Sequence, residues 1–164
     1  PESALAVKEY VSLARLPHTG LLGYMSKADK AAVDEALSLM RLESFGKRSL
    51  SSLSGGERPR AAIAQALAQG AEYILLDEPT ASLDPGVKRE IWNLAAHLTR
   101  DCGKGVIMVT HDINEAIELS DRVLIMQGGC LRFIGSTGEC LASALIEDIF
   151  GMRRFSAEGR TLFV

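Results

Sequence analysis

One segment of this chain, residues 73–84, constrains its fold and its chemistry more than any other. It reads Tyr-Ile-Leu-Leu-Asp-Glu-Pro-Thr-Ala-Ser-Leu-Asp, a short apolar run that ends in two adjacent acids. A run of this length predicts a strand over residues 74–76 that is buried on both faces, as the strands of parallel sheets are. Asp77 would then project from the carboxyl end of the strand, which is where α/β proteins bind their ligands.

The acidic pair is suited to hold a metal ion and to activate water. The Asp77 carboxylate can hold Mg²⁺, usually through water, because that ion gives up its hydration shell reluctantly. Glu78 follows directly and can polarise an attacking water molecule. The alternative for Glu78 is an ordinary surface acid in the turn before Pro79. Its place next to Asp77, and before Ala-Ser-Leu-Asp, favours the chemical role.

A glycine-bearing turn precedes this strand and opens an alanine-rich helix that we expect over residues 55–69. The turn comprises Ser54, Gly55, Gly56 and Glu57. Glycines let the backbone approach a ligand closely, and the free amides and dipole of a helix start attract an anion. An ordinary N-capped helix is the alternative, and Ser-Gly-Gly taken alone favours it. The arginines that follow and the acidic strand beyond them favour a phosphate-binding turn.

The sequence assigns a chemical role to His111 but to no other histidine and to no cysteine. His111 follows a second apolar run, residues 106–110, so we expect it at the same sheet edge as the acidic pair, where an imidazole can hydrogen-bond a γ-phosphate. His18 and His97 have no such context. The cysteines, at positions 102, 130 and 140, are odd in number and scattered, which favours reduced thiols over a disulfide framework or a zinc site.

The pattern along the rest of the chain predicts strands that alternate with helices, which is typical of an α/β fold with a parallel sheet. Ser26 and Asp29 resemble a capping box, and Gln127-Gly128-Gly129 predicts a hairpin turn. We expect helices over residues 3–16, 26–40, 87–98, 113–119, 139–142 and 144–150, and further strands over residues 106–109, 123–126, 130–134 and 160–164.

Length and composition exclude several classes of protein. The chain has 164 residues, enough for one domain or a large piece of one, and its 47% hydrophobic and 24% charged residues are typical of a globular protein. A net charge of -3 gives no support for nucleic-acid binding. No apolar run approaches the roughly 20 residues that span a bilayer, and no secretory signal is visible. Pro1 suggests that the chain starts inside a longer gene product.

In this order, the motifs resemble those of ATP-binding cassette (ABC) ATPases over nearly the whole chain. Leu-Ser-Gly-Gly-Glu resembles the signature motif, the acidic strand the Walker B motif, Ser82-Leu83-Asp84 the D-loop, and Thr-His-Asp the switch histidine. The resemblance implies the second half of a P-loop NTPase-like parallel-sheet core, over residues 51–164. It also implies that residues 1–50 form an N-terminal helical subdomain that docks on a membrane permease.

The resemblance also implies how the site is assembled from two protomers. ATP and Mg²⁺ would bind across a homodimer, with Ser54, Gly55, Gly56 and Glu57 serving one site and Asp77, Glu78 and His111 the opposite one. Asp84, in the D-loop, would lie across the dimer interface. No Gly-x-x-x-x-Gly-Lys-Ser/Thr occurs in the chain. We expect the Walker A loop to precede Pro1, and the fragment alone to be inactive.

Weaker signals concern the transported substrate. Residues 11–23 and 148–152 resemble ATPases of iron-siderophore, haem and cobalamin importers, which work at the cytoplasmic face of the inner membrane and are linked through the permease to a substrate-binding protein. Two alternatives stay open: a non-transport ABC ATPase that acts on DNA or ribosomes, and a binding-only module for a permease. Pro59 departs from the family, and we expect its missing N–H to delay or distort the signature helix.

Overall fold

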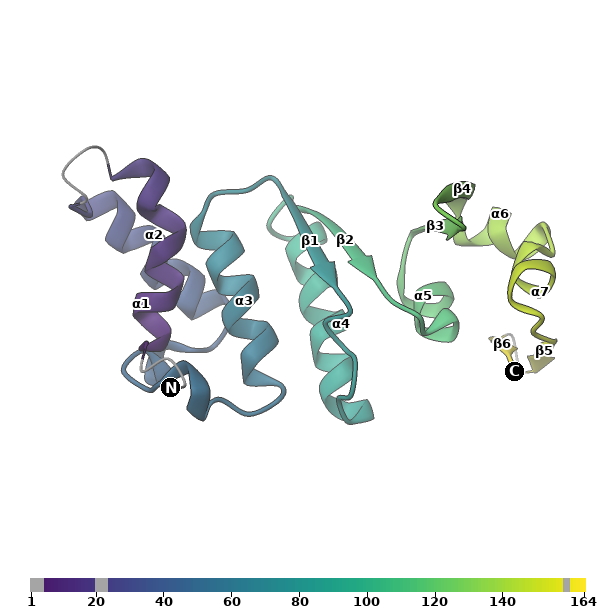
Figure 1. Ribbon diagram of the computed structural model, residues 1–164, viewed down its shortest axis with the longest axis horizontal. Coiled ribbons are helices and arrows are strands. Elements are labelled where there is room, and N and C mark those ends of the chain that lie inside the picture. The colour runs from purple at the N-terminus through teal and green to yellow at the C-terminus, as the bar shows by residue number, and fades with distance from the viewer. Residues whose placement is uncertain (1–4, 20–23, 158–159) are drawn as a thin grey trace. The chain divides into compact units, whose positions relative to one another are not determined.

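The computed structural model describes residues 5–19, 24–157 and 160–164, and it divides the chain into two compact units. The first unit is Pro1–Val109 and the second is Thr110–Val164, and each is described by itself (Figure 1). The division expected near residue 50, between a helical subdomain and the sheet core, stays a prediction.

Helices make up the first part of the first unit and pack around one core. The predicted capping box is confirmed, since the Asp29 N–H donates to Ser26 Oγ at 3.1 Å and the Ser26 N–H donates to Asp29 Oδ2 at 2.9 Å. The elements are α1 (Val7–Ser12), the 3₁₀ helix η1 (Leu13–His18), α2 (Lys27–Leu39), the 3₁₀ turns η2 (Glu43–Phe45) and η3 (Leu50–Ser52), and α3 (Glu57–Ala68).

The first helix differs from its prediction in its second half. We expected one α-helix up to Leu16, but the α-helix ends at Ser12 and continues as η1, which contains Pro17. Proline disfavours the α conformation in the residue before it and supplies no N–H, so the chain tightens into a 3₁₀ turn. The apolar spacing still predicts the buried side, because Val7 and Val11 are fully buried.

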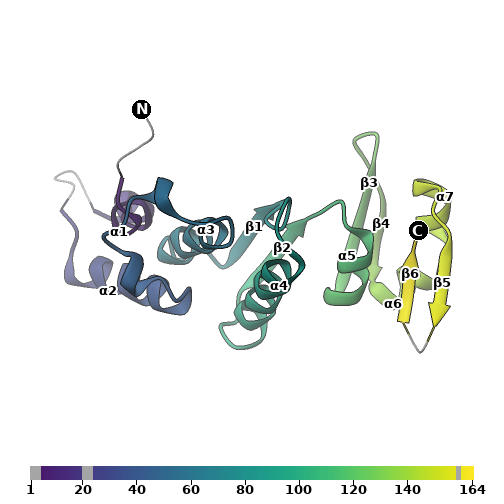
Figure 2. The same ribbon diagram turned by 90° about the horizontal axis from the view of Figure 1, so that it is seen from below.

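A parallel pair of strands completes the first unit. β1 (Tyr73–Asp77) pairs in parallel with β2 (Gly105–Val109), so that Leu75 lies opposite Ile107 and Asp77 opposite Val109. The crossover between them is α4 (Pro85–Arg100), which runs beside the two strands (Figure 2). This is the βαβ connection that the alternation of strands and helices predicts.

The expectation that the acidic strand is buried on both faces is wrong for this chain. Ile74 and Leu76 are buried in the core that α3 and α4 share, with relative exposures of 2% and 9%. The alternate side chains Tyr73 and Leu75 are 72% and 68% exposed. The reason is geometric: successive side chains of a strand point to opposite faces, and the helices of this unit pack on one of them.

The second unit contains two antiparallel hairpins. The predicted turn is confirmed: Gly128 and Gly129 have φ of +59° and +76°, and they join β3 (Arg122–Gln127) to β4 (Cys130–Ser136). β6 (Arg160–Phe163) was predicted, whereas its partner β5 (Arg154–Ala157) was not. The helices of this unit are α5 (Ile113–Leu119), α6 (Thr137–Ala142) and α7 (Leu145–Phe150).

A small core holds the second unit together. It is built on Ile125, Cys140, Ile146 and Phe163, which come from a strand, two helices and the C-terminal hairpin. The Asn114 side chain exchanges hydrogen bonds with the backbone N–H and C=O of Phe163, at 2.8 and 3.0 Å, and so ties α5 to β6. Across the described parts of both units, no helix has the length and apolar character needed to cross a membrane.

Candidate functional site

The acidic pair stands at the carboxyl end of β1, as the sequence predicts. Asp77 is the last residue of the strand, and Glu78 leaves it with φ of +45°, a left-handed conformation that side chains other than glycine rarely adopt. Two backbone hydrogen bonds hold Glu78 there: its N–H donates to the Val109 C=O at 2.9 Å, and its C=O accepts from the Ala81 N–H at 3.1 Å. The direction of Glu78 is therefore set by β2 and by the following turn.

The segment that follows the acidic pair ends by starting α4. Ser82 also has a positive φ, of +60°, and Thr80 is buried. Asp84 is the N-cap residue of α4, with Pro85 behind it as the first helical residue, a position that proline favours. The Asp84 carboxylate makes no capping hydrogen bond to the helix. The Asp84 side chain thus lies at the start of α4 without capping it.

The glycine-bearing turn is closed by two hydrogen bonds between Ser54 and Glu57. The Ser54 N–H donates to Glu57 Oε2 at 2.7 Å, and the Glu57 N–H donates to Ser54 Oγ at 3.4 Å. The first of these bonds is the main cause that lowers the pKa of Glu57. Because Ser54 Oγ acts as the acceptor, its O–H remains a donor for a ligand. Ser54 can therefore close the turn and still offer a hydroxyl donor to a ligand.

Packing also leaves little room for a side chain at the two glycines of this turn, and least at Gly56, a reason that the sequence did not reveal. A Cβ on Gly56 would lie 2.6 Å from Val87 Cγ1 in α4, closer than real Cβ atoms approach. A Cβ on Gly55 would lie 3.3 Å from Leu83 Cδ2. The start of α3 thus packs directly on the segment that follows the acidic strand.

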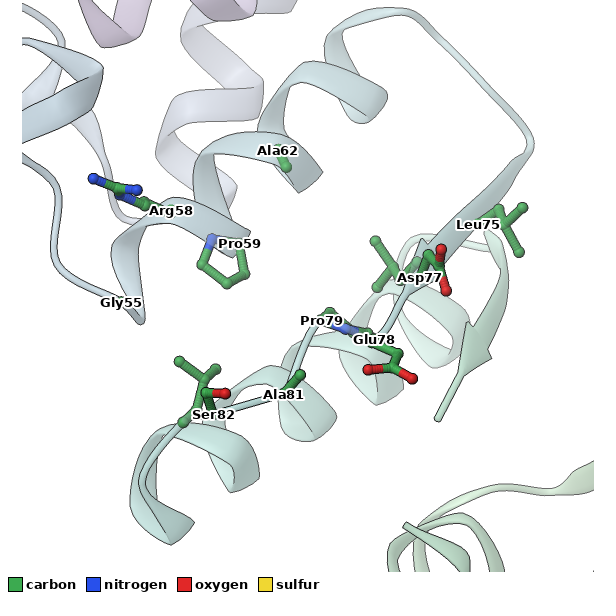
Figure 3. Close-up of a pocket in the computed structure, with 12 residues that line it drawn as sticks. Gly55, Arg58, Pro59, Ala62, Leu75, Asp77, Glu78, Pro79, Ala81 and Ser82 are labelled. Atoms are coloured by element: carbon green, nitrogen blue, oxygen red, sulfur yellow. The ribbon is translucent and has the colours of Figure 1, made fainter. Parts of the chain in front are cut away.

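A hollow of about 560 Å³ lies between these two segments. In Figure 3, Gly55 and Pro59 lie on one side of it, and Asp77, Glu78 and Pro79 lie on the other. Its lining consists of Gly55, Arg58, Pro59, Ala62, Leu75, Leu76, Asp77, Glu78, Pro79, Ala81, Ser82 and Leu83. The structure therefore brings the two motifs of the first unit together around one concave surface.

The two arginines after the turn are occupied by structural contacts. Arg58 donates to the backbone C=O groups of Leu53 and Ser51, at 3.3 and 3.2 Å, and its side chain points away from the acidic pair (Figure 3). Arg60 forms an ion pair with Glu90 of α4. Arg58 thus holds the turn before α3 in place, and Arg60 joins α3 to α4.

Pro59 does not delay the helix, contrary to one of the outcomes expected for it. α3 begins at Glu57, and Pro59 is its third residue. The backbone N–H of Arg58 donates to the Ser54 C=O at 3.1 Å, so the helical hydrogen bonding has begun before the proline. Proline costs little in a first turn, where N–H groups lack intrahelical partners.

Mg²⁺ fits the residues at this site on the chemistry of the donors. Among the described residues, no group of three or more His, Cys, Asp or Glu side chains is placed to hold a metal ion. Mg²⁺ needs no such cage, since one carboxylate, water molecules and the phosphates of a nucleotide complete its shell. Asp77 at the strand end can supply that carboxylate.

The remaining residue expected at the site, His111, belongs to the second unit. It is the second residue after β2. The residues on either side of it are joined by a hydrogen bond, in which the Asp112 N–H donates to Thr110 Oγ1 at 3.0 Å. Its expected place beside Asp77 and Glu78 stays a prediction.

The fold and the site define an α/β protein of P-loop NTPase type, and comparisons with known proteins agree. Residues 3–81 match the family model described as ABC transporter. A solved structure, described as an inward-facing conformation of a metal-chelate type ABC transporter, has a TM-score of 0.88 at 26% identity. It covers 100% of this chain and 67% of that chain. The chain is therefore similar to ATP-binding proteins of ABC transporters in sequence and in fold.

Two curated relatives are ATP-binding proteins named for the transport of petrobactin and of achromobactin. The petrobactin import ATP-binding protein FpuC of Bacillus anthracis is 44% identical over 148 residues, which are 90% of this chain and 54% of that protein. The achromobactin transport ATP-binding protein CbrD of Dickeya dadantii (strain 3937) is 37% identical over 148 residues, 90% of this chain and 55% of that protein. The chain thus spans about half the length of the curated relatives it matches.

Proposed function

We propose that this chain is the catalytic half of an ATP-hydrolysing importer subunit, with Asp77 and Glu78 in the central roles. Asp77 holds Mg²⁺ through water, and Glu78 polarises the water that attacks the γ-phosphate. The observation that carries the proposal is the conformation of Glu78. It is held in a left-handed conformation by hydrogen bonds to β2 and to its own turn. Strain of this kind, which costs about 1–3 kcal/mol, is found mostly at functional sites.

The other candidate residues complete the proposal. Ser54, Gly55 and Gly56 present a hydroxyl donor and a helix start to the phosphates bound by a second protomer, and Glu57 holds this turn closed. Asp84 has a carboxylate that α4 does not use, which suits a contact across a dimer interface. His111 would donate a hydrogen bond to the γ-phosphate.

The proposed partners are a second ATPase protomer, a membrane permease and, through the permease, a substrate-binding protein. Residues 1–50 are proposed as the helical subdomain that docks on the permease, and residues 51–164 as the second half of the nucleotide-binding core. This arrangement would place the protein at the cytoplasmic face of the inner membrane. The expected contact segment is Leu16 to Tyr24. Leu21 and Leu22 lie outside the described residues, whereas Leu16 and Tyr24 are 58% and 80% exposed.

The proposed cargo is a substrate of iron-siderophore, haem or cobalamin type. The proposal is supported by the two relatives named above, whose names assign them to petrobactin and achromobactin. The cargo does not contact the ATPase, so nothing in the hollow at Glu78 selects it. Uptake of radioactive iron with each siderophore, in cells lacking and then regaining the complete gene, is the measurement that assigns the cargo.

The same proposal predicts that this chain alone neither binds ATP tightly nor hydrolyses it. The Walker A loop supplies the amides and the lysine that hold the β- and γ-phosphates, and no such motif occurs in the chain. We expect no heat of ATP binding in calorimetry on the purified 164-residue chain, and Mg²⁺-dependent hydrolysis by the complete protein. Tight binding by the chain alone would contradict this prediction. A complete protein without hydrolysis would favour the binding-only alternative.

A further inference from the structure

The C-terminal end of α4 brings a cysteine, a histidine and an aspartate into one hydrogen-bonded row. His97 Nδ1 lies 2.6 Å from Asp101 Oδ2, and the other ring nitrogen, Nε2, lies 3.9 Å from Cys102 Sγ. His97 is in the last turn of the helix, Asp101 is its C-cap residue, and Cys102 follows directly. None of these residues belongs to the hollow around Glu78.

The turn that carries this row is fixed by its backbone. The Asp101 N–H donates to the His97 C=O at 2.9 Å, and the Lys104 N–H reaches back to the Leu98 C=O at 3.0 Å. Gly103 between them has φ of +64°, the left-handed residue that commonly closes a helix. Lys104 Nζ also donates to the Ala71 C=O at 2.9 Å. The helix end therefore presents Cys102 to His97 as part of the fold.

The order of the three groups is that of an activated nucleophile. An aspartate that accepts a hydrogen bond from Nδ1–H leaves Nε2 of the neutral ring without a proton, so that nitrogen is the one able to accept the thiol proton. A nucleophile, a base within reach and a third group that orients the base form the general arrangement of nucleophilic sites. The 3.9 Å separation lies at the long end for a hydrogen bond to sulfur, as is common before a reagent binds.

A small reagent can reach this site. The side chains of His97 and Asp101 are 46% and 64% exposed, and Cys102 is half-buried against the edge of the first core. The chain offers two internal references for this thiol. Cys130 is exposed at the start of β4, whereas Cys140 is fully buried and burial raises its pKa.

We propose that Cys102 is a modification site whose thiol, activated by His97, undergoes exchange with small disulfides. His97 Nε2 takes the thiol proton, and the Cys102 thiolate attacks one sulfur of the disulfide. The new S–S bond forms as the old one breaks. The leaving thiolate takes the proton back from His97, so the products are a mixed disulfide on Cys102 and one free small thiol.

The modification would act away from the nucleotide-binding end of α4. The helix has 16 residues. At about 1.5 Å per residue it is roughly 24 Å long, with Asp84 at its start and the cysteine row at its end. A mixed disulfide on Cys102 would thus leave the hollow around Glu78 open, and its first effect would be on surfaces that approach the end of α4.

Competition between cysteines within one molecule tests the proposal. The complete protein is mixed with a limiting amount of oxidised glutathione, and mass spectrometry of peptides measures the mixed disulfide at Cys102 and Cys130. We expect Cys102 to react about tenfold faster than Cys130 despite its smaller exposure, which is less than the roughly 10²–10⁴-fold that a general base typically contributes. His97→Gln should slow Cys102 about tenfold and leave Cys130 unchanged, with Asp101→Asn intermediate. His18→Gln, exposed on η1, is the control and should change neither rate.

Two results would overturn the proposal. One is that Cys102 reacts no faster than Cys130 in the native protein, and the other is that His97→Gln leaves the ratio of the two rates unchanged. Unfolding of the His97→Gln variant would not produce the expected slower reaction of Cys102. Loss of structure exposes a half-buried thiol and speeds its reaction, and it also makes Cys140 reactive, whereas loss of the base slows Cys102 alone.

Discussion

Gly56 and Val87 pack against each other so closely that no side chain fits between them. A Cβ at position 56 would lie 2.6 Å from Val87 Cγ1, and the contact joins the start of α3 to the first turn of α4. One of these residues belongs to the turn proposed to bind phosphate, and the other follows the acidic strand. The two motifs are therefore in direct contact, and a shift of α4 would displace the glycine-bearing turn.

The first prediction concerns the order of stability among glycine variants. Gly56→Ala should destabilise the protein by about 1–3 kcal/mol, the usual cost of overpacking, and Gly55→Ala by less. Gly86→Ala is the control, because a Cβ there meets nothing within 4 Å, and in a helix it should stabilise by about 0.5–1 kcal/mol. Urea unfolding measures all three. Adding Val87→Ala to Gly56→Ala should restore much of the loss; no restoration would mean that the contact is not the cause.

The second prediction tests the proposed base. In the complete protein, Glu78→Gln should lower the rate of ATP hydrolysis on the order of 10²–10⁴-fold, because glutamine keeps the shape of the side chain but cannot take a proton from water. Nucleotide binding should persist. Glu118→Gln, an exposed acid on α5, is the matched control and should keep normal turnover. Near-normal steady-state hydrolysis in Glu78→Gln would remove Glu78 from this role.

The third prediction concerns Pro59. Since Pro59 is the third residue of α3 and the helix starts normally at Glu57, Pro59→Gln in the complete protein should raise ATP hydrolysis or leave it unchanged. Glutamine would add a backbone N–H for the Gly55 C=O and a side-chain donor beside the hollow. Initial rates at saturating ATP measure the effect. A clear loss of activity would show that the proline itself holds Ser54 in its working position.

The fourth prediction concerns acid stability. The Ser26 hydroxyl, followed by the Arg15 guanidinium, lowers the pKa of Asp29 to about 2 through hydrogen bonds to its carboxylate. This pKa lies below the ordinary aspartate value of 3.8, so the ionised group stabilises the fold above about pH 3.8, and its contribution is lost as the pH falls towards 2. Asp29→Asn should lower stability at neutral pH and flatten this acid dependence.

Thermal unfolding across the acid range provides the measurement for Asp29. Its side chain is only 6% exposed and lies 2.8 Å from Arg15, whereas the Asp34 side chain, paired with Lys8, is 58% exposed. Asp34→Asn is therefore the control and should change stability by less than about 0.5 kcal/mol. Equal acid profiles for the Asp29 and Asp34 variants would contradict the prediction.

The fifth prediction places the permease at the segment around η1. Single cysteines at Leu16 and Tyr24, which are exposed apolar positions, should crosslink to the permease in membranes that carry the assembled transporter. A cysteine at Leu131, an exposed apolar residue of the β3–β4 hairpin, gives the comparison. Strong crosslinks at Leu131 with none at Leu16 and Tyr24 would place the docking surface elsewhere.

The sequence by itself determined the features that depend on neighbours along the chain. The Ser26–Asp29 capping box, the turn at Gly128 and Gly129, and the position of Asp77 at a strand end all follow from local chemistry. The spacing of His97 and Asp101 was equally visible as an i, i+4 pair. It was missed as a site because the chemical role depends on the turn at Gly103, which brings Cys102 to the same ring.

The tertiary structure decided what depends on elements that approach from elsewhere in the chain. The contact of Gly56 with Val87, and the use of Arg60 to hold Glu90, join segments about 30 residues apart. The exposure of Leu75 was likewise invisible in the apolar run. An apolar side chain indicates only that its face of a strand can be buried. Burial itself requires another element to pack on that face, and only the arrangement of α3 and α4 shows which face of β1 they cover.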